Sequence, residues 1–360
     1  MRSNPYEGLP PTAFWKTGVA ERPPYDVEGI YQQKFSILPS DKIGTAGSCF
    51  AQHIGRYLRA NRFKVMDVEP APGWLPADLR AKYGFSTYSA RYGNIYTVAQ
   101  LAQLARECSG AFAPQAAVWE RDGRFFDAMR PSLEPDGFDS AAQLEAHRSF
   151  HLGRVRLLLR ELDVFVFTLG LTEGWVHRAS KTVYPVAPGV VAGVFDDSAF
   201  ASHSYGFSEM EALFDDFLAS LKTIRGDRGL PKIILTVSPV PLTATASGAH
   251  VLVANARSKS MLRALAACLS EKHAFIDYFP SFEIVTNPAA RGSFFDGNLR
   301  TVTSHGVREV MKVFFAAHRQ ATAETAASAA PKAARSEPPA APAEADLQCE
   351  DAILEAFANG

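Results

Sequence analysis

The sequence predicts an α/β domain built around a mostly parallel sheet. Short apolar runs alternate with amphipathic stretches that are long enough to form helices, and this alternation is typical of βαβ units. Five strands are expected, near residues 43, 64, 164, 233 and 275. Polar or glycine-rich turns follow three of these strands directly. Because ligands of parallel sheets bind outside the carboxyl ends of the strands, the sequence predicts one site assembled from several loops.

The first half of the chain combines an irregular start with two strands. Residues 1–34 are rich in proline and aromatic residues without a clear period, which predicts a wrap over the domain surface. Apolar residues recur at helical spacing after the first strand, and Asp122-Gly123 is a dipeptide typical of hairpin tips. The expected elements are strands at 42–46 and 63–70, helices at 49–60 and from about 97, and a hairpin around 118–129.

The second half alternates strands and helices more regularly. Residues 163–170 form an uninterrupted apolar run, typical of a strand that is buried on both faces. The proline-containing stretch 176–194 predicts a β-hairpin excursion. The remaining expected elements are a helix ending near 162, helices at 208–225, 255–271 and 303–318, and strands at 232–239 and 274–279.

The composition changes near the C-terminus. Residues 319–345 are a low-complexity run rich in Ala, Pro and Glu, which cannot bury enough apolar surface to become ordered. Residues 346–360 place Leu347, Ile353, Leu354 and Phe357 where they can form a short amphipathic helix, a possible docking peptide for a protein partner. The expected organisation is therefore a wrap (1–34), an α/β domain (35–318), a disordered linker (319–345) and a short amphipathic segment (346–360).

Composition excludes several classes of function. Lys and Arg number 37 against 38 Asp and Glu, so there is no overall basic field of the kind that nucleic-acid binding requires. No apolar run approaches the roughly 20 residues of a membrane span. The start of the chain lacks the apolar stretch of a secretory signal. The four cysteines have no metal-type spacing, and neither a dinucleotide-binding nor a Walker pattern is present. We therefore expect a cytoplasmic protein without metal or cofactor.

The most informative turn follows the first expected strand. Gly47 permits a sharp bend, and Ser48, Cys49 and His53 follow within seven residues at the start of a helix. A helix N-terminus lowers the pKa of a thiol and stabilises an oxyanion. The alternative interpretation is structural: Ser48 caps the helix, Cys49 is a small buried residue and His53 is solvated.

The turn and the motifs that follow it resemble the GSCFA family of the SGNH/GDSL hydrolase superfamily. The sequence GSCFA itself occupies residues 47–51, and further matching motifs extend the resemblance over about residues 35–315. The resemblance implies a flavodoxin-like, three-layer α/β/α fold. The further motifs are YGNIYT (92–97), FTLGLTEGW (167–175), TVSPVPLTAT (236–245) and FFDGNLRTVTSHGV (294–307).

The resemblance also implies roles for individual residues. The nucleophile position of the superfamily falls on Cys49, and its aspartate position falls on Ser48; whether Ser48 or Cys49 attacks is left open. Gly93, with Asn94 beside it, matches an oxyanion donor. Gly170-Leu171-Thr172 matches a Gly-x-Asn block in which Thr172 replaces Asn, and Glu173 follows directly as a group that can orient a cation or a histidine.

The catalytic base has no single match. The superfamily pattern Asp-x-x-His is absent from the last motif, where Thr301 occupies the expected histidine position. Three histidines remain as alternatives. They are His305 at the start of the last helix, His53 next to the nucleophile turn, and His250 in the loop after the fourth strand.

Two classes of function follow, with a third behind them. The first is an SGNH-like esterase or O-acyltransferase that forms a covalent acyl intermediate on Cys49, with an acylated carbohydrate or small ester as its substrate by analogy with the superfamily. The second is a non-catalytic module of the same fold that binds carbohydrate or a protein partner. The third is a redox-sensing thiol at Cys49.

Overall fold

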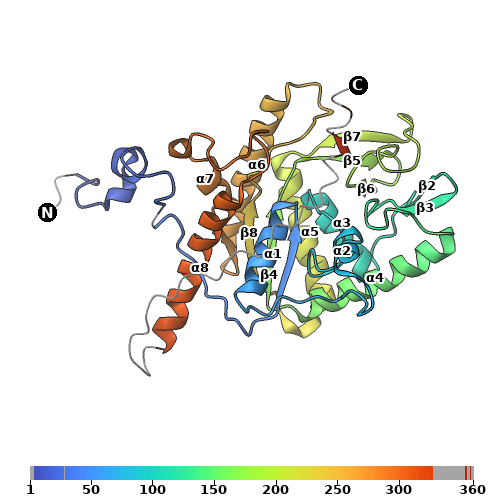
Figure 1. Ribbon diagram of the computed structural model, residues 1–360, viewed down its shortest axis with the longest axis horizontal. Helices are drawn as coiled ribbons and strands as arrows, with labels where there is room; N and C mark the ends of the chain where they lie inside the picture. Colours follow the sequence, from blue (N-terminus) through green and yellow to red (C-terminus); the bar gives the residue numbers. More distant parts are fainter. Residues whose placement is uncertain (1–3, 28, 327–352, 355–356, 358–360) are drawn as a thin grey trace.

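A four-stranded parallel sheet forms the centre of the molecule (Figure 1). The computed structural model describes residues 4–27, 29–326, 353–354 and 357 of the 360-residue chain. The strand order is β1-β4-β8-β9, and each adjacent pair is parallel. The strands are β1 (Ile43–Gly47), β4 (Val164–Leu169), β8 (Lys232–Val237) and β9 (Ile276–Tyr278).

The prediction of a fifth strand near residue 64 is wrong. Within the described residues, this segment makes one parallel bridge, between Ile43 and Val65. Beyond it, the backbone N–H of Val68 donates to the Ser89 carbonyl (2.9 Å), while the Ser89 N–H donates to the Thr45 carbonyl (3.4 Å). Residue 89 therefore occupies the edge of β1 on which the expected strand would have continued.

The bridge at Val65 nevertheless locates the switch point of the sheet, where successive segments of the chain are added to opposite edges of β1. Val65 pairs with one edge of β1, and β4 pairs with the other. Segments that follow β1 therefore lie on both sides of it, so that the order along the sheet reverses between β1 and β4. Such a switch point opens a crevice at the carboxyl ends of the strands.

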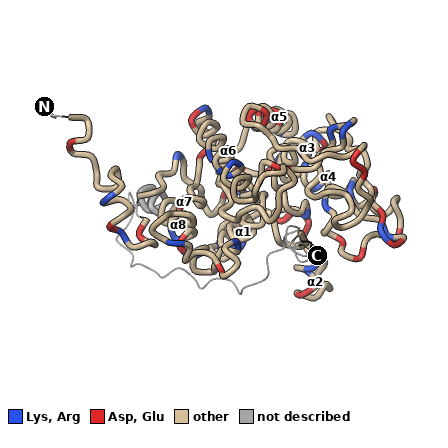
Figure 2. The backbone as a smooth tube through the Cα atoms, turned by 90° about the horizontal axis from the view of Figure 1, so that it is seen from above, with Lys and Arg blue, Asp and Glu red and all other residues tan. Residues whose placement is uncertain are grey.

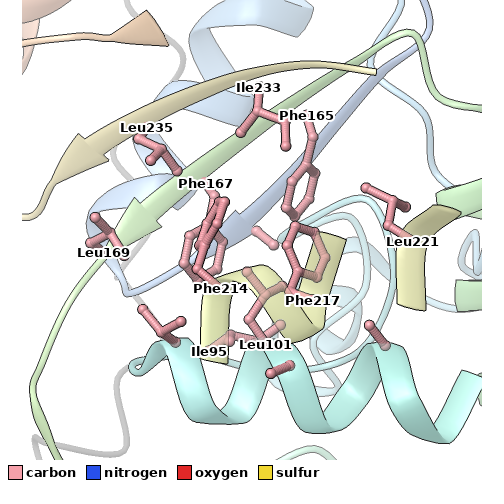
Figure 3. Close-up of a cluster of buried hydrophobic side chains, with 14 of the residues drawn as sticks. Ile95, Leu101, Phe165, Phe167, Leu169, Phe214, Phe217, Leu221, Ile233 and Leu235 are labelled. Atoms are coloured by element: carbon pink, nitrogen blue, oxygen red, sulfur yellow. The ribbon is translucent and has the colours of Figure 1, made fainter. Parts of the chain in front are cut away.

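Helices cover both faces of the sheet (Figure 1). Apolar side chains of β4 and β8, among them Phe165, Phe167 and Leu235, pack against Phe214 and Phe217 on one face (Figure 3). That face is covered by α3 (Val98–Ser109), α4 (Ala141–Glu161), α5 (Phe207–Arg225) and α6 (Val251–Lys272). The opposite face is covered by α1 (Phe50–Ala60), α7 (Ser281–Thr286) and α8 (Ser304–Ala326). The short helix α2 (Ala77–Lys82) lies on the surface.

Two small antiparallel sheets lie beside the central one. The predicted hairpin is confirmed as β2 (Val118–Arg121) and β3 (Arg124–Asp127), with positive φ at both tip residues, Asp122 and Gly123. The predicted excursion is a three-stranded sheet rather than a hairpin, because β7 pairs with β5 on the edge opposite β6. Its strands are β5 (Glu173–His177), β6 (Val183–Tyr184) and β7 (Phe200–Ser204).

Short helices precede the first strand of the domain, and the long helix α8 follows its last strand. The start contains a 3-10 helix (Pro11–Ala13) and a π-helix (Lys16–Ala20). The Tyr31 hydroxyl donates to Asp277 in the edge strand β9 (2.9 Å). Helix α8 extends past the expected end at residue 318. The rest of the expected linker lies outside the described residues, as does most of the segment 346–360.

The surface carries no dominant sign of charge. Basic and acidic residues are interspersed along the backbone (Figure 2), in agreement with the net charge of −1. In the part of the chain that the structure describes, no helix is both long enough and apolar enough to cross a membrane.

Buried histidines should make the protein lose stability in mild acid. Burial lowers the pKa values of His151 and His318 from 6.5 to about 4, with Arg130 and Lys232 contributing respectively. The unfolded chain therefore binds more protons than the folded one as pH falls from 6.5 toward 4. At pH 5 each histidine should cost about 2 kcal/mol of unfolding free energy relative to pH 7.5.

Urea unfolding of the wild type and of His318→Phe at both pH values checks this expectation. The decrease in unfolding free energy between pH 7.5 and pH 5 should be smaller in the variant by about 2 kcal/mol. An equal decrease in both proteins would show that His318 is not titrating in this range.

Candidate functional site

The turn after β1 requires a glycine. Gly47 has φ of +134°, and a Cβ at this position would lie 2.4 Å from the backbone oxygen of Thr168 on β4. The N–H of Ser48 donates to that same oxygen (3.1 Å). The backbones of β1 and β4 thus approach each other closely at the switch point, and helix α1 starts immediately after the turn with Cys49 as its N-cap residue.

Ser48 and Cys49 point to different surroundings. Ser48 is buried against Gly170, where an added Cβ would lie 2.8 Å from the Ser48 Cβ. Its hydroxyl oxygen has no hydrogen-bond partner among the described residues. Cys49 is 4 % exposed and belongs to the apolar cluster between the sheet, α1 and α8, which also contains Phe50 and Phe294.

The loop that contains Gly93 and Asn94 reaches the same turn. The N–H of Ile95 donates to the carbonyl of Gly47 (2.9 Å), and Gly93 has φ of +68°. The hydroxyl of Tyr88 donates to the Ser48 carbonyl (3.1 Å) and also bonds to Oδ1 of Asn94. These bonds fix the Asn94 side chain with its amide nitrogen on the side away from Tyr88.

Two side chains of α6 hydrogen-bond to the backbone of the loop after β4. The buried Lys259 ammonium donates to the Gly170 carbonyl (2.8 Å), and the Ser258 hydroxyl accepts from the N–H of Thr172 (3.1 Å). The Thr172 hydroxyl is buried and has no hydrogen-bond partner among the described residues. Glu173 accepts from the Thr245 hydroxyl at both carboxylate oxygens (2.9 and 2.8 Å), which ties this loop to the one after β8.

The three candidate histidines occupy different environments. Burial, with Arg56 nearby, lowers the pKa of His53 to about 4. His250 is exposed and caps α6, because its Nδ1 accepts from the N–H of Leu252 (3.2 Å). His305 is exposed in the first turn of α8, and its ring lies 5.6 Å from that of Phe294. His53 and His305 both lie against the apolar cluster that contains Cys49, since the ring of His53 is 5.7 Å from that of Phe50.

Thr301, at the position where the superfamily has histidine, has a structural role. Its carbonyl accepts from the N–H of Asp296 (2.8 Å), and its hydroxyl accepts from the Asn298 amide (3.0 Å). Together with the bridge between Phe295 and Val302, these bonds close a small hairpin. In the described part of the chain, no three His, Cys, Asp or Glu side chains are grouped as metal ligands.

A cavity of about 380 Å³ opens beside Gly93 and is called the Gly93 cavity below. Gln52, three residues after Cys49 on α1, forms part of its wall, together with Asn94 and Tyr88; neither Ser48 nor Cys49 does. Most of the wall is apolar. The remaining lining residues are Gly84, Thr87, Arg121, Pro131, Ser132, Leu133, Pro135, Val191 and Ile353.

A buried network of charged side chains binds the backbone of Arg91 and so supports the loop that contains Gly93. The Glu69 carboxylate accepts from the backbone N–H of Arg91 (2.6 Å), and Arg130 donates to the Arg91 carbonyl (2.9 Å). Asp127 accepts from both Arg130 and Arg148. Burial alone would raise the pKa of Asp127, but the two guanidinium groups hold it well below its usual range. The backbone of Arg91, two residues before Gly93, is therefore held by hydrogen bonds at both its N–H and its carbonyl.

Sequence reasoning identified the loops but missed the residues that hold them together. Tyr88, Ser258 and Thr245 were not predicted to take part. Tyr88 lies in the polar, aromatic stretch that precedes YGNIYT, and nothing in its spacing distinguishes it. Its role depends on a contact between segments that are 40 residues apart.

The fold and this arrangement define an α/β protein with a glycine-dependent turn at a switch point, where three loops meet. The family model for GSCFA matches residues 42–314, and the chain therefore belongs to the GSCFA family. This family is loosely related to SGNH-type hydrolases. Neither a curated protein nor a solved structure matches the chain.

Enlarging Gly170 should disrupt the contact between the two loops. An added Cβ would meet Ser48 at 2.8 Å and the Tyr96 carbonyl at 3.1 Å, so Gly170→Ala should cost about 1 to 3 kcal/mol of unfolding free energy. Gly153 is an exposed residue inside α4 with nothing within 4 Å of an added Cβ. Gly153→Ala should therefore stabilise by about 0.5 to 1 kcal/mol. Thermal or urea unfolding of the two variants would reject the packing argument if both behaved alike.

Removing the central carboxylate of the network should be severely destabilising. Asp127→Ala leaves buried guanidinium groups without their partner, which should cost about 3 to 5 kcal/mol. Glu120, on the adjacent strand of the same hairpin, is exposed, and Glu120→Ala should stay within about 0.5 kcal/mol of the wild type. Urea unfolding measures both. A loss below 1 kcal/mol for Asp127→Ala would mean that the network does not support the Gly93 loop.

Proposed function

We propose that this chain is an SGNH-type acyl hydrolase or O-acyltransferase that acts through a covalent acyl intermediate on Cys49. The proposal is supported by the position of the Gly47 turn at the switch point, where the loops containing Gly93 and Gly170 meet it. Topology of this kind places ligands at the carboxyl ends of strands, next to the candidate nucleophile.

The observation that carries the proposal is the pair of buried hydroxyls of Ser48 and Thr172, neither of which has a hydrogen-bond partner among the described residues. Eleven buried side-chain polar atoms of the described residues lack a partner, and burying such a group costs about 1 to 3 kcal/mol. Ser48 and Thr172 differ from most of the others in lying at the carboxyl ends of the strands. Ser48 directly follows β1, and Thr172 lies three residues after the end of the neighbouring parallel strand β4. A substrate carbonyl or hydroxyl at this point would satisfy them.

Cys49 is a better nucleophile than Ser48 in this setting. A thiolate attacks without a base held in tight contact, whereas a serine hydroxyl requires one. The N-terminal end of α1 favours the thiolate, because the helix dipole stabilises negative charge there. We assign Ser48 to positioning or hydrogen bonding beside Gly170.

His305 is the best candidate for the base. The pKa of His53, lowered to about 4, makes it a weak proton acceptor, and Nδ1 of His250 is already used to cap α6. His305 starts the last helix next to Phe294 and is exposed to solvent. From that position it can exchange protons with water and with the leaving group.

The reaction then follows from these roles. His305 takes the proton of the Cys49 thiol, and the resulting thiolate forms a bond to the acyl carbon of the ester. The negative charge that develops on the carbonyl oxygen is stabilised by N–H groups of Cys49 and Gly93 and by the Thr172 hydroxyl. The bond to the leaving oxygen breaks, and that oxygen takes a proton from His305. Water or an acceptor hydroxyl next attacks the thioester, gives its proton to His305, and releases the thiolate.

The substrate class is an acylated carbohydrate or another small ester. The Gly93 cavity offers apolar walls for an acyl or ring face, together with Gln52 and Asn94 as hydrogen-bonding groups. Most sites for small molecules combine apolar walls with a few polar groups in this way. The acylated carbohydrate rests on the superfamily analogy.

Trapping the acyl intermediate tests the proposal. The protein is incubated with p-nitrophenyl esters of short and medium acyl chains, and the adduct is located by intact mass and peptide mapping. We expect an adduct on Cys49 in the wild type. Cys49→Ala should abolish it and lower ester turnover by at least about a thousandfold.

Cys268 supplies the matched control, since it is a half-buried thiol on α6 that should play no part. Cys268→Ala should retain the adduct and the turnover. Turnover that survives in Cys49→Ala would reject the nucleophile. Carbohydrate binding without turnover, unchanged in Cys49→Ala, would instead support the non-catalytic module.

A further inference from the structure

A small cavity shares one lining residue with the Gly93 cavity, and it is called the His151 cavity below. Asn94 borders both cavities. The His151 cavity has a volume of about 30 Å³, which is room for one or two water molecules, since each needs roughly 10 to 15 Å³. A sugar or an acyl chain would not fit into it.

One ring nitrogen of His151 is held by a carboxylate, which makes the other nitrogen an acceptor. Nδ1 lies 2.8 Å from Oε2 of Glu69, and both side chains are buried. Burial alone would raise the pKa of Glu69, but its hydrogen bonds with His151 and with the N–H of Arg91 hold that pKa below its usual value. Burial, with Arg130 nearby, lowers the pKa of His151 to about 4, so the ring is neutral at neutral pH. The carboxylate therefore accepts the hydrogen of Nδ1, and Nε2 carries a lone pair.

This lone pair lies at the His151 cavity. His151 belongs to the cavity wall and Glu69 does not, so the ring edge that reaches the cavity is the one away from Nδ1, which carries Nε2. Nε2 is buried and has no hydrogen-bond partner among the described residues. Buried polar groups of folded proteins are generally bonded to protein or to ordered water. The cavity therefore calls for a small molecule that donates a hydrogen bond.

The rest of the wall favours a neutral ligand over an ion. Its charged side chains are already in ion pairs, since Arg130 and Arg148 both donate to Asp127, and Arg148 also donates to Glu107. The amide of Gln103 donates to a backbone carbonyl of β6 (3.1 Å). A water molecule can donate to the histidine nitrogen without breaking any of these bonds.

We propose that the His151 cavity binds one ordered water molecule, which donates a hydrogen bond to Nε2 of His151 and accepts one from the side-chain amide of Asn94. The amide nitrogen of Asn94 is the group on offer, because its oxygen is held by Tyr88. Glu69 also accepts from the N–H of Arg91 (2.6 Å), so the water closes a hydrogen-bonded ring that joins residues 91 and 94 of the same loop. His151 is then a positioning residue for this loop. The benefit to catalysis rests on the proposed function, whereas the water site does not.

A high-resolution crystal structure of the full-length wild type tests the site directly. We expect a water molecule at about 2.7 to 3.2 Å from both Nε2 of His151 and Nδ2 of Asn94. A cavity without density, a water that does not reach both atoms, or an Nε2 bonded to a protein group would overturn the proposal.

Oxygen-17 relaxation dispersion counts long-lived internal waters in solution. His151→Phe keeps a flat ring but removes the acceptor, so it should lower the count by about one. His203→Phe is the matched control, because His203 lies on β7, is partly exposed and does not belong to the cavity wall. Its count should equal that of the wild type. An unchanged count in a folded His151→Phe would contradict the site, and if this variant does not fold, the wild-type crystal structure decides.

The outcomes separate this site from the proposed function. A water in place with no acyl adduct on Cys49 would reject the proposed function and leave the water site standing. An adduct on Cys49 in a protein without the water would do the reverse. If both hold, His151→Phe should slow adduct formation roughly ten- to a hundredfold through misplacement of the loop, and His203→Phe should not.

Discussion

The close approach of β1 and β4 at their carboxyl ends is the constraint on which the site depends. Gly47 and Gly170 leave no room for side chains where the two strands end, since an added Cβ at either would meet the neighbouring segment at less than 3 Å. This approach brings the turn that carries Ser48 and Cys49 against the loop that carries Thr172. The hydrogen bond from the N–H of Ile95 to Gly47 adds the Gly93 loop to the same point.

The rest of the domain supplies the rigidity that this geometry needs. Apolar side chains on both faces of the sheet pack against two helical layers, and the Asp127 network fixes the backbone on either side of Arg91. Charged groups in a protein interior are stabilising only as a complete set. The chain uses such a set below the Gly93 loop, where an apolar core would fix the backbone less specifically.

Access to this region involves segments from distant parts of the sequence. The Gly93 cavity is bounded by α1, by the loop that contains Gly93 and by the residues that follow β3. A second cavity, of about 180 Å³, is bounded by β5 and by the loops after β4 and β8. Loops that carry binding residues on a rigid scaffold can change without disturbing the core.

The sequence by itself determined the α/β class, the four central strands and the helices on both faces, because buried strands and amphipathic helices have different apolar periods. It also pointed to Gly47 and Gly170, because turns after parallel strands converge at one edge of the sheet, whereas Gly93 came from the family resemblance. Only the tertiary structure decided that the segment near Val65 makes one bridge rather than a strand, that Tyr88 and Lys259 hold the loops, and that Thr301 closes a hairpin. These outcomes depend on contacts between segments far apart in the chain, and local patterns carry no information about such contacts.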